Sequence, residues 1–492
     1  MGLSKFHFLE ETAMPQTTLL TGRRYELSVL QHALRDDQSH FIAVYGRRRI
    51  GKTFLIREAF EYRFTFQHAG LFNRKKEEQL QAFSSSLKDA GYIPTRSPRN
   101  WLEAFDELKE LIRRSTEKRK VIFIDELSWM DTRSCDLMAA LEHFWNAWAS
   151  SRKDILLIVC ASATSWMLSN VVHNKGGLYN RLTEQLPLRG FSLSECQELV
   201  QNNGLVLTRD QILQAYMVFG GVPYYWGFLQ KGKSLSQNID LMFFADQAPL
   251  KDEFRYLYAS LFRHPDGYLQ IIRTLAQRKV GMTREELIAA SGIPNTGDLT
   301  KKLTELESCG FIRKYNAYGM KKKNAVYQLI DFFTLFCLRF MEDGQQDPHF
   351  WANQINTPAV NTWMGLAFER VCLEHVEQLK KGLGISGVLT KVNSWYCPPD
   401  QDRGIFGSQI DLLIVRRDQV INLCEMKYSG TEYIATEKTE RDLNRKIHDF
   451  VSCTATRFAI YPTLITPCGI ADNAHSSIFQ SVLTLDNLFP PK

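Results

Sequence analysis

Short runs of apolar residues alternate with longer amphipathic segments over the first part of the chain. The runs FIAVYG, VIFID and ILLIVCASA are hydrophobic at nearly every position, whereas residues 76–89 and 100–117 have helical periodicity. Runs of the first kind are typical of buried parallel strands, and the second pattern is typical of amphipathic helices. We therefore predict an α/β domain, a parallel sheet with crossover helices, over residues 1–192.

Strand-like runs disappear after this domain. Between residues 193 and 260 the hydrophobic pattern stays helical and is interrupted by GGVP at positions 220–223. Glycine and proline in succession break a helix, so we predict several helices here, forming a lid that follows the sheet.

Residues 261–345 show helix signals followed by a hairpin signal. Thr283 and Glu286 form a T-x-x-E capping box at the start of a short helix, and a second helix is predicted over 297–308. Two strand-like runs then flank a lysine-rich tip at 321–323. This order of helices and hairpin matches a winged helix-turn-helix domain.

The remaining residues, 346–492, combine a long helix with strands. The helix LAFERVCLEHVEQLKK precedes the runs QIDLLIV and INLCEMKY, and a charged helix and the run RFAIYP follow. We predict a second, smaller α/β domain.

Length and composition agree with a chain of several folded domains. Its 492 residues exceed the size at which one hydrophobic core stops growing, and its hydrophobic content of 44% is ordinary. Ten cysteines without a CxxC pair or a His/Cys cluster argue against a zinc site and a disulfide framework. No apolar run approaches the roughly 18 residues of a membrane span, and the N-terminal residues carry acidic groups in place of a signal-peptide pattern. We expect a cytoplasmic protein with reduced thiols and no membrane association.

The sequence GRRRIGKT at positions 46–53 fits the phosphate-binding pattern GxxxxGK[ST]. A strand-like run precedes it and a helix-like segment follows it, a context that a chance glycine turn with a lysine would lack. The glycines let backbone N–H groups surround phosphates at a helix N-terminus, while Lys52 reaches the terminal phosphates and the Thr53 hydroxyl can hold Mg²⁺. The arginines in the loop either contact phosphate or cover it. We predict that ATP and Mg²⁺ are bound by Gly46, Arg47, Arg48, Arg49, Ile50, Gly51, Lys52, Thr53 and Phe54.

Two adjacent acids, Asp125 and Glu126, stand at the end of the run VIFID, about seventy residues after the phosphate-binding pattern. Asp125 can act on Mg²⁺ and Glu126 can polarise the attacking water, because paired acids at the end of a buried strand are costly unless a cation and water use them. A solvated strand end is the alternative. Ser162 ends the next strand, where we expect a polar residue that senses the terminal phosphate.

The segment GLYNR at positions 177–181 precedes the fifth strand-like run. A guanidinium at Arg181 can reach the phosphate of a neighbouring subunit in a ring or dimer, as an arginine finger does. The prediction is therefore a homo-oligomer through Arg181; a surface arginine at a helix end is the alternative.

Several motifs together resemble the archaeal-type AAA+ ATPases, a branch near the STAND NTPases. They are GR-x-x-E at 22–26, the triple-arginine P-loop, the DE strand end, LYNR and GGVPYY. The last two are short, and Asn180 stands where glycine is more usual before the arginine. The resemblance implies a P-loop NTPase with a helical lid, a winged helix and a C-terminal PD-(D/E)XK nuclease-like domain of the restriction-endonuclease-like α/β fold, over nearly the full length of the chain.

The last domain carries a second candidate site. Asp411 lies in QIDLLIV, and Glu425 and Lys427 lie in CEMKY on the strand expected to pair with it. This is the metal-dependent nuclease pattern, in which Asp411 and Glu425 hold Mg²⁺ and Lys427 orients or deprotonates the attacking water. Glu369 matches an additional acid on the preceding helix. Because the pattern is permissive, a degenerate domain that binds nucleic acid or a partner without cutting stays open.

Positive charge gathers on the expected winged helix. Between Lys301 and Lys323 there are seven Lys/Arg and two Glu, in a chain of net charge +6. Such charge would neutralise phosphates along a groove, so nucleic acid, DNA in preference, is the expected partner through backbone contacts. Winged helices also serve as protein docking modules, which is the alternative.

Two functions remain from the sequence. The first is an ATP-dependent, DNA-directed nuclease or switch, in which ATP state controls the C-terminal site. The rival is a non-enzymatic, STAND-like switch whose C-terminal domain binds nucleic acid or a partner without cleaving. A small-molecule kinase shares the P-loop but leaves the winged helix and the last domain unexplained.

Overall fold

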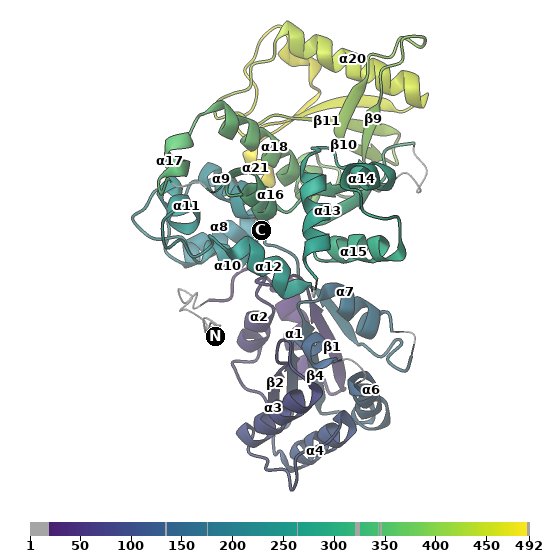
Figure 1. Cartoon of the computed structure of the whole chain (residues 1–492). Helices are drawn as coiled ribbons and strands as arrows, with labels where there is room; N and C mark the ends of the chain where they lie inside the picture. The colour runs from purple at the N-terminus through teal and green to yellow at the C-terminus, as the bar shows by residue number, and fades with distance from the viewer. Residues whose placement is uncertain are drawn as a thin grey trace. The chain divides into compact units, whose positions relative to one another are not determined.

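The structure is a computed structural model that describes residues 19–132, 135–174, 176–262, 264–319, 325–342, 344 and 347–489. Its contacts divide the chain into two compact units, which we call the N-terminal unit (residues 16–190) and the C-terminal unit (residues 191–492) (Figure 1). The lysines at 321–323 lie outside the described residues. Among the described helices, none combines the length and the apolar character that a bilayer span needs.

The N-terminal unit is built on a five-stranded parallel sheet, as its apolar runs predict. The strand order is β2-β3-β4-β1-β5, and every pairing is parallel. The central strands are buried at almost every position because helices cover both faces of the sheet. The strands are β1 (His40–Tyr45), β2 (Phe66–Ala69), β3 (Lys120–Asp125), β4 (Ile155–Ala161) and β5 (Glu184–Pro187).

Successive residues of each strand belong to two separate cores. On β1, Phe41 and Ala43 pack in the core that includes α3, α4 and α6, whereas Ile42 and Val44 pack in the core that includes α1 and α2. Helices α3 and α4 lie side by side (Figure 1). The helices are α1 (Arg24–Arg35), α2 (Lys52–Ala59), α3 (Lys76–Asp89), α4 (Trp101–Arg114), α5 (Leu127–Met130), α6 (Leu137–Ala147) and α7 (Thr164–Met167).

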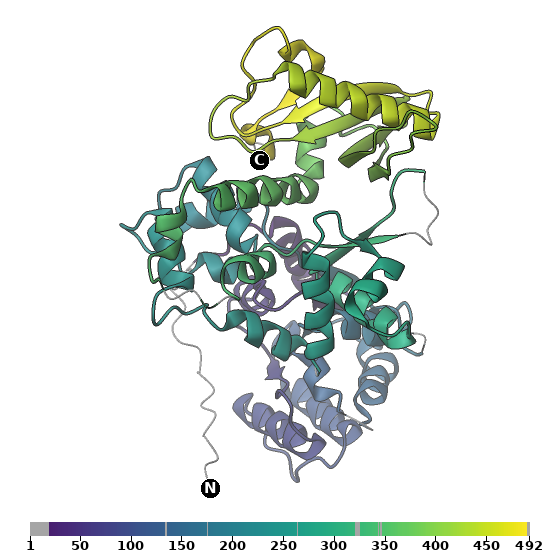
Figure 2. The same ribbon diagram turned by 45° about the horizontal axis from the view of Figure 1, so that its top comes forward.

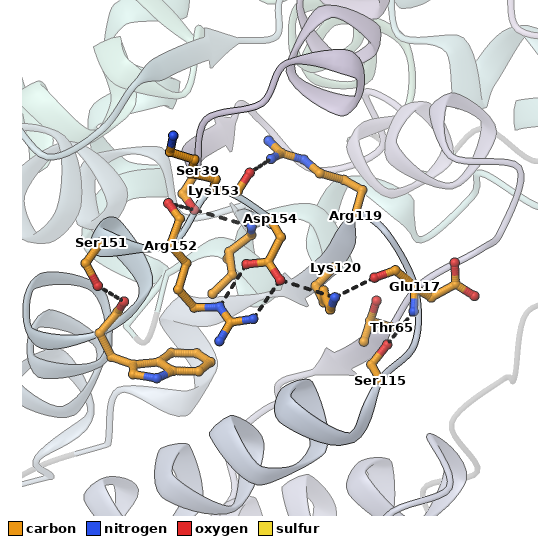
Figure 3. A network of polar contacts seen from close by, with 12 residues as sticks. Ser39, Thr65, Ser115, Glu117, Arg119, Lys120, Ser151, Arg152, Lys153 and Asp154 are labelled. Atoms are coloured by element: carbon orange, nitrogen blue, oxygen red, sulfur yellow. Dashed lines mark hydrogen bonds and ion pairs between the residues drawn. The ribbon is translucent and has the colours of Figure 1, made fainter.

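A polar network fixes the edge of this sheet where β1, β3 and β4 begin (Figure 3). The carboxylate of Asp154 accepts hydrogen bonds from the Arg152 guanidinium at 2.8 and 2.6 Å and pairs with Lys120 at 3.2 Å. Ser39, just before β1, donates to the carbonyl oxygen of Arg152 at 2.8 Å. Arg152 and Lys120 hold the pKa of Asp154 below its usual value although burial acts against them. The network ties together the starts of three adjacent strands, whose opposite ends carry the P-loop and the acidic pair.

The C-terminal unit begins with the helices predicted after position 193. The motif GGVP has a structural reason: the Phe191 N–H donates to the Gly221 carbonyl oxygen at 2.6 Å, and a side chain on Gly221 would clash with the Phe191 backbone. Only glycine allows this close approach of two chain segments. The helices are α8 (Leu193–Asn202), α9 (Arg209–Phe219), α10 (Pro223–Trp226), α11 (Leu235–Phe243) and α12 (Glu253–Leu261).

Three helices and a small antiparallel sheet of order β6-β8-β7 follow. The predicted capping box is present, because Thr283 accepts from the Glu286 N–H at 3.3 Å and Glu286 accepts from the Thr283 N–H at 2.8 Å. Beyond β7, the Tyr318 N–H donates to the Ser394 carbonyl oxygen at 2.7 Å, which joins this segment to the last sheet. The elements are α13 (Asp266–Ala276), β6 (Met282–Thr283), α14 (Arg284–Ser291), α15 (Gly297–Ser308), β7 (Ile312–Tyr315) and β8 (Val326–Leu329).

The chain ends in a five-stranded mixed sheet of order β13-β12-β11-β10-β9. Leu443 and Phe450 of α20 pack on one face, and Figure 2 shows this yellow-green helix running along the sheet. Phe368 and Val371 of α18 share a core with residues of the other face. The elements are α16 (Phe332–Phe340), α17 (Phe350–Gln354), α18 (Pro358–Glu374), α19 (Val376–Gly382), β9 (Thr390–Cys397), β10 (Ser408–Arg416), β11 (Val420–Met426), α20 (Glu437–Thr454), β12 (Ala459–Ile465), β13 (Ser481–Leu483) and α21 (Leu485–Leu488).

Candidate nucleotide site and acidic site

Two glycines shape the loop that joins β1 to α2. Gly46 has a φ of 154°, and a side chain there would clash with the Leu188 carbonyl oxygen just after β5. Gly51, the residue before α2, has a φ of 87° in the left-handed region that favours glycine. The loop 46–51 therefore winds closely around the first turn of α2, where the helix leaves backbone N–H groups without helical partners.

The P-loop and the acidic strand end meet in the structure. Lys52 is buried, and its ammonium donates to the carbonyl oxygens of Gly46 and Arg47, both at 3.0 Å, so it lies inside the curve of the loop. The Thr53 hydroxyl donates to the carboxylate of Asp125, the last residue of β3, at 2.6 Å. A hydroxyl and a carboxylate in contact are oxygen ligands of the kind Mg²⁺ takes in nucleotide sites, so these two residues fit the ion.

Ser162 links the lysine to the second acid. It follows β4, which lies between β1 and β3 in the sheet, and this order places it between the P-loop and the acids. Lys52 Nζ donates to Ser162 Oγ at 2.9 Å. The Glu126 carboxylate accepts from the Ser162 hydroxyl and, at 3.1 Å, from its N–H. Burial raises the pKa of Glu126 and Asp125 adds to the rise, although Lys52 opposes it. A carboxylate of raised pKa is a better proton acceptor than an ordinary one.

The other predicted loop residues surround this centre. Ile50 is buried in the core beneath the loop. The Arg48 guanidinium lies 6.0 Å from the centre of the Trp129 ring. The half-buried members of the predicted set are Arg47, Arg48, Arg49, Gly51, Thr53 and Phe54.

Arg23 supports the loop from behind, and the sequence motifs did not give it a role. It is 6% exposed, and one guanidinium nitrogen donates to the carbonyl oxygens of Ile50 at 3.2 Å and Arg189 at 2.6 Å. It also pairs with Glu26 at 3.6 Å. The GR-x-x-E motif thus has a local explanation, because its arginine bonds the P-loop backbone and the chain just beyond β5.

Arg181 is exposed, at the end of the segment before β5. The preceding Asn180 has a φ of 52°. Asparagine tolerates this left-handed conformation better than other side chains do, which accounts for its use where glycine is more usual.

Comparisons with known proteins agree with this geometry. Residues 20–227 match a family model described as an ATPase domain predominantly from Archaea. The chain carries an ATPase domain of the archaeal type. The match extends beyond the sheet into α8, α9 and α10, so the archaeal-type ATPase domain includes the GGVP motif.

Relatives cover most of the chain at low identity. An uncharacterized protein of Methanocaldococcus jannaschii is 23% identical over 444 residues, which are 87% of this chain and 92% of the relative. Among solved structures, the Walker-type ATPase of Pyrococcus abyssi is 16% identical with a TM-score of 0.47, covering 67% of this chain and 99% of that one. The ORC2 protein of Aeropyrum pernix, in ADPNP and ADP complexes, is 15% identical with a TM-score of 0.42, covering 75% and 98%.

Outside the archaeal-type ATPase domain, the second candidate site lies on β10 and β11. These strands are antiparallel and pair Leu412 with Cys424, so Asp411 and Glu425 lie next to this pair at the same end of the two strands. The pairing of β10 with β9 shifts by one residue between Ile410 and Leu413, which places Asp411 within a β-bulge. Bulges often re-aim a side chain beside a functional site.

Lysines contact the acids at this position. Glu425 pairs with Lys427, the residue just after β11, at 2.8 Å and with Lys446 of α20 at 2.7 Å. Burial raises the pKa of Glu425, but Lys446 and Lys427 together hold it below its usual value. The predicted motif does not include Lys446. This lysine lies 21 residues after Glu425, on a separate helix, and only the fold brings the two together.

A third lysine contacts the other two acids. Lys279, from the turn between α13 and β6, lies 2.8 Å from Glu369 of α18 and 3.7 Å from Asp411. Among the described residues, no three His, Cys, Asp or Glu side chains form a group that could hold a metal ion. The arrangement therefore does not fit Mg²⁺ as it stands, since the predicted ligands are paired with ammonium groups.

Proposed function

We propose that the archaeal-type ATPase domain binds ATP with Mg²⁺ and hydrolyses it, and that its nucleotide state controls a nucleic-acid-directed, nuclease-like C-terminal unit. The observation that supports the first part is the chain of hydrogen bonds from Lys52 through Ser162 to Glu126. These bonds connect Lys52, a residue of the type that binds terminal phosphates, to Glu126, a carboxylate of raised pKa. The connection passes through Ser162 at the end of β4, the strand between β1 and β3.

Each residue of the nucleotide site has a separate task in this proposal. Mg²⁺ neutralises phosphate charge when bound, and Thr53 and Asp125 are the residues that would hold it. Lys52 binds the terminal phosphates. Glu126 orients the attacking water and accepts its proton, for which its raised pKa is suited. Ser162 holds both side chains in register.

Arg181 is proposed to act on the nucleotide of a second copy of the chain. Its exposure supports this, because an arginine that works in a neighbouring subunit has to be accessible. The proposal therefore includes assembly of the protein into a homo-oligomer.

For the C-terminal unit we propose a winged helix over residues 261–345 and a nuclease-like domain over residues 346–492. The helices α14 and α15 with the β7–β8 hairpin support the first part, and the sheet that carries Asp411, Glu425 and Lys427 supports the second. Lys301, on α15, is exposed and is a candidate for contact with the nucleic-acid backbone, DNA in preference.

The alternative is a nucleotide-dependent switch whose C-terminal unit binds nucleic acid or a partner without cutting it. One observation favours this alternative: Glu369, Asp411 and Glu425 are all in contact with lysines. An acid that already pairs with a cation has less need of a metal ion.

One experiment separates the two functions. The full-length protein is incubated with Mg²⁺, ATP and linear, circular or single-stranded DNA, and both phosphate release and DNA length are measured. The nuclease proposal expects cleavage that Lys427→Ala abolishes while ATP turnover continues, and turnover that falls at least about a hundred-fold in Lys52→Ala and Glu126→Gln. Lys438→Ala, an exposed lysine of α20, is the matched control and should leave both activities unchanged.

Intact DNA with continued ATP turnover would support the switch and contradict the nuclease. Turnover at the wild-type rate in both Lys52→Ala and Glu126→Gln would remove the proposed ATPase mechanism itself.

A further inference from the structure

Glu369 and Asp411 do not fit a metal ion as they stand, because the Lys279 ammonium contacts both carboxylates. We propose that Lys279 is an internal cation that occupies the Glu369–Asp411 carboxylate pair, and that it has to be displaced before a divalent cation binds there. This inference rests on the proposed nuclease-like function, and it assigns the control of that site to the turn between α13 and β6, within the proposed winged helix.

The contact geometry supports a shared cation position. The Lys279 ammonium lies 2.8 Å from Glu369 Oε1 and 3.7 Å from Asp411 Oδ2, so one positive charge serves two carboxylates that come from α18 and β10. The two acids are only 17% and 23% exposed. Bringing two partly buried carboxylates together costs free energy unless a cation lies between them.

One ammonium leaves the charge of this pair incompletely balanced. Glu369 and Asp411 carry two negative charges when ionised, whereas the Lys279 ammonium that contacts them carries one positive charge. Two arginines lie near, the buried Arg370 and the half-buried Arg313, but their hydrogen bonds go elsewhere. Arg370 donates to the carbonyl oxygens of Leu329 and Leu366, and Arg313 donates to Gln328. A divalent cation would balance two carboxylates better than a single ammonium does.

The backbone of Lys279 is held by hydrogen bonds, whereas its side chain is partly exposed to solvent. Gln328 donates to the Lys279 carbonyl oxygen at 2.5 Å, and the Tyr315 hydroxyl donates to the Val280 carbonyl oxygen at 2.6 Å. Gly281, with a φ of 85°, packs too closely on the Tyr327 carbonyl for any side chain. The side chain of Lys279 is 38% exposed, so the displacement that we propose is a change of its rotamer toward solvent, with the turn in place.

The contact comes from the segment that also carries the proposed winged helix. Both groups that anchor the turn, Tyr315 and Gln328, belong to the β7–β8 hairpin. Lys279 is thus attached to the hairpin but directed into the acids of the nuclease-like domain. The choice between the two functions then depends on whether this ammonium stays or leaves.

The test is metal binding, measured without DNA or nucleotide. The full-length protein is titrated with Mn²⁺, and free Mn²⁺ is followed by electron paramagnetic resonance. The site in question is the part of the binding that Asp411→Asn removes. We expect Lys279→Met, which keeps the length of the side chain without its charge, to tighten this site about ten-fold. Lys279→Gln should act in the same direction, so that loss of folding in one variant does not decide the result.

The neighbouring cation provides a matched control. Arg278 pairs with Glu286 and not with the acids of the sheet, so Arg278→Met should leave Mn²⁺ affinity unchanged. Equal Asp411-dependent affinity in the wild type and in both Lys279 variants would overturn the role of Lys279 and leave the metal site intact. If no variant binds Mn²⁺ in an Asp411-dependent manner, both the internal cation and the metal-dependent function are wrong, and the switch remains.

Discussion

At the scale of single residues, the nucleotide site is held by side chains from several strands and turns. Ser162 contacts both Lys52 and Glu126, and Arg23 contacts the backbone of Ile50. The place of Arg23 behind the loop makes it a positioning residue, because it holds the backbone that has to surround the phosphates.

Removal of the Arg23 guanidinium should therefore weaken nucleotide binding more than the chemical step. We expect Arg23→Ala to raise the Kd for ATP about ten-fold and to change kcat by less than about three-fold, since one buried charged hydrogen-bonding group is lost. Arg23→Lys, which keeps the charge, should recover part of the affinity. Arg24→Ala, at an exposed neighbouring position, is the control. Unchanged affinity in Arg23→Ala, or a loss confined to kcat, would contradict the positioning role.

At the scale of elements, the start of the C-terminal unit is fixed by a buried histidine. His375 lies between α18 and α19, its Nδ1 contacts the Val371 carbonyl oxygen at 2.8 Å and its Nε2 accepts from the Leu193 N–H at 3.1 Å. An acceptor at Nε2 requires the neutral ring. Burial accordingly lowers the pKa of His375 to about 4.

This histidine should make stability depend on pH. Its folded pKa of about 4 lies below the ordinary 6.5, so the unfolded chain takes up the proton first as pH falls. Its contribution is present above pH ~6.5 and is lost as pH falls toward about 4, by about 2 kcal/mol at pH ~5. Thermal unfolding of His375→Gln and wild type across this range checks it. The variant should be less stable near neutral pH and should lose less stability on acidification; parallel pH curves would contradict the assignment.

Local signals in the sequence determine most of these elements. The helix predicted over 76–89 has those bounds, and the one predicted over 100–117 covers residues 101–114 because the Asn100 side chain caps it by accepting the Glu103 N–H at 2.8 Å. Both predictions rest on interactions between residues a few positions apart, which a sequence displays directly.

Contacts between distant segments could not be predicted in this way. The sequence indicates the acids Asp411 and Glu425, but the lysine that contacts Asp411 is 132 residues away, at position 279. No motif in the sequence names Asp411 as the partner of Lys279, or the Ile50 and Arg189 carbonyl oxygens as partners of Arg23. Such contacts follow from the packing of whole elements, so only the folded chain reveals that the predicted metal ligands are paired with ammonium groups.

At the scale of the whole molecule, the chain combines an archaeal-type ATPase domain with a C-terminal sheet that carries acids and lysines. The proposed function needs the first to bind nucleotide before anything in the second is controlled. ATP can control the proposed winged helix and the acids next to Lys279 only if Lys52 and its neighbours bind a triphosphate.

The most direct test is therefore a calorimetric titration of the full-length protein with ATP and Mg²⁺, with Lys52→Ala as the paired variant and thermal unfolding as the check that both are folded. We predict one ATP bound per chain in the wild type and an affinity at least about ten-fold weaker in Lys52→Ala, because the charged contact to the terminal phosphates is lost. No binding to the folded wild type, or equal affinity in both proteins, would contradict the account.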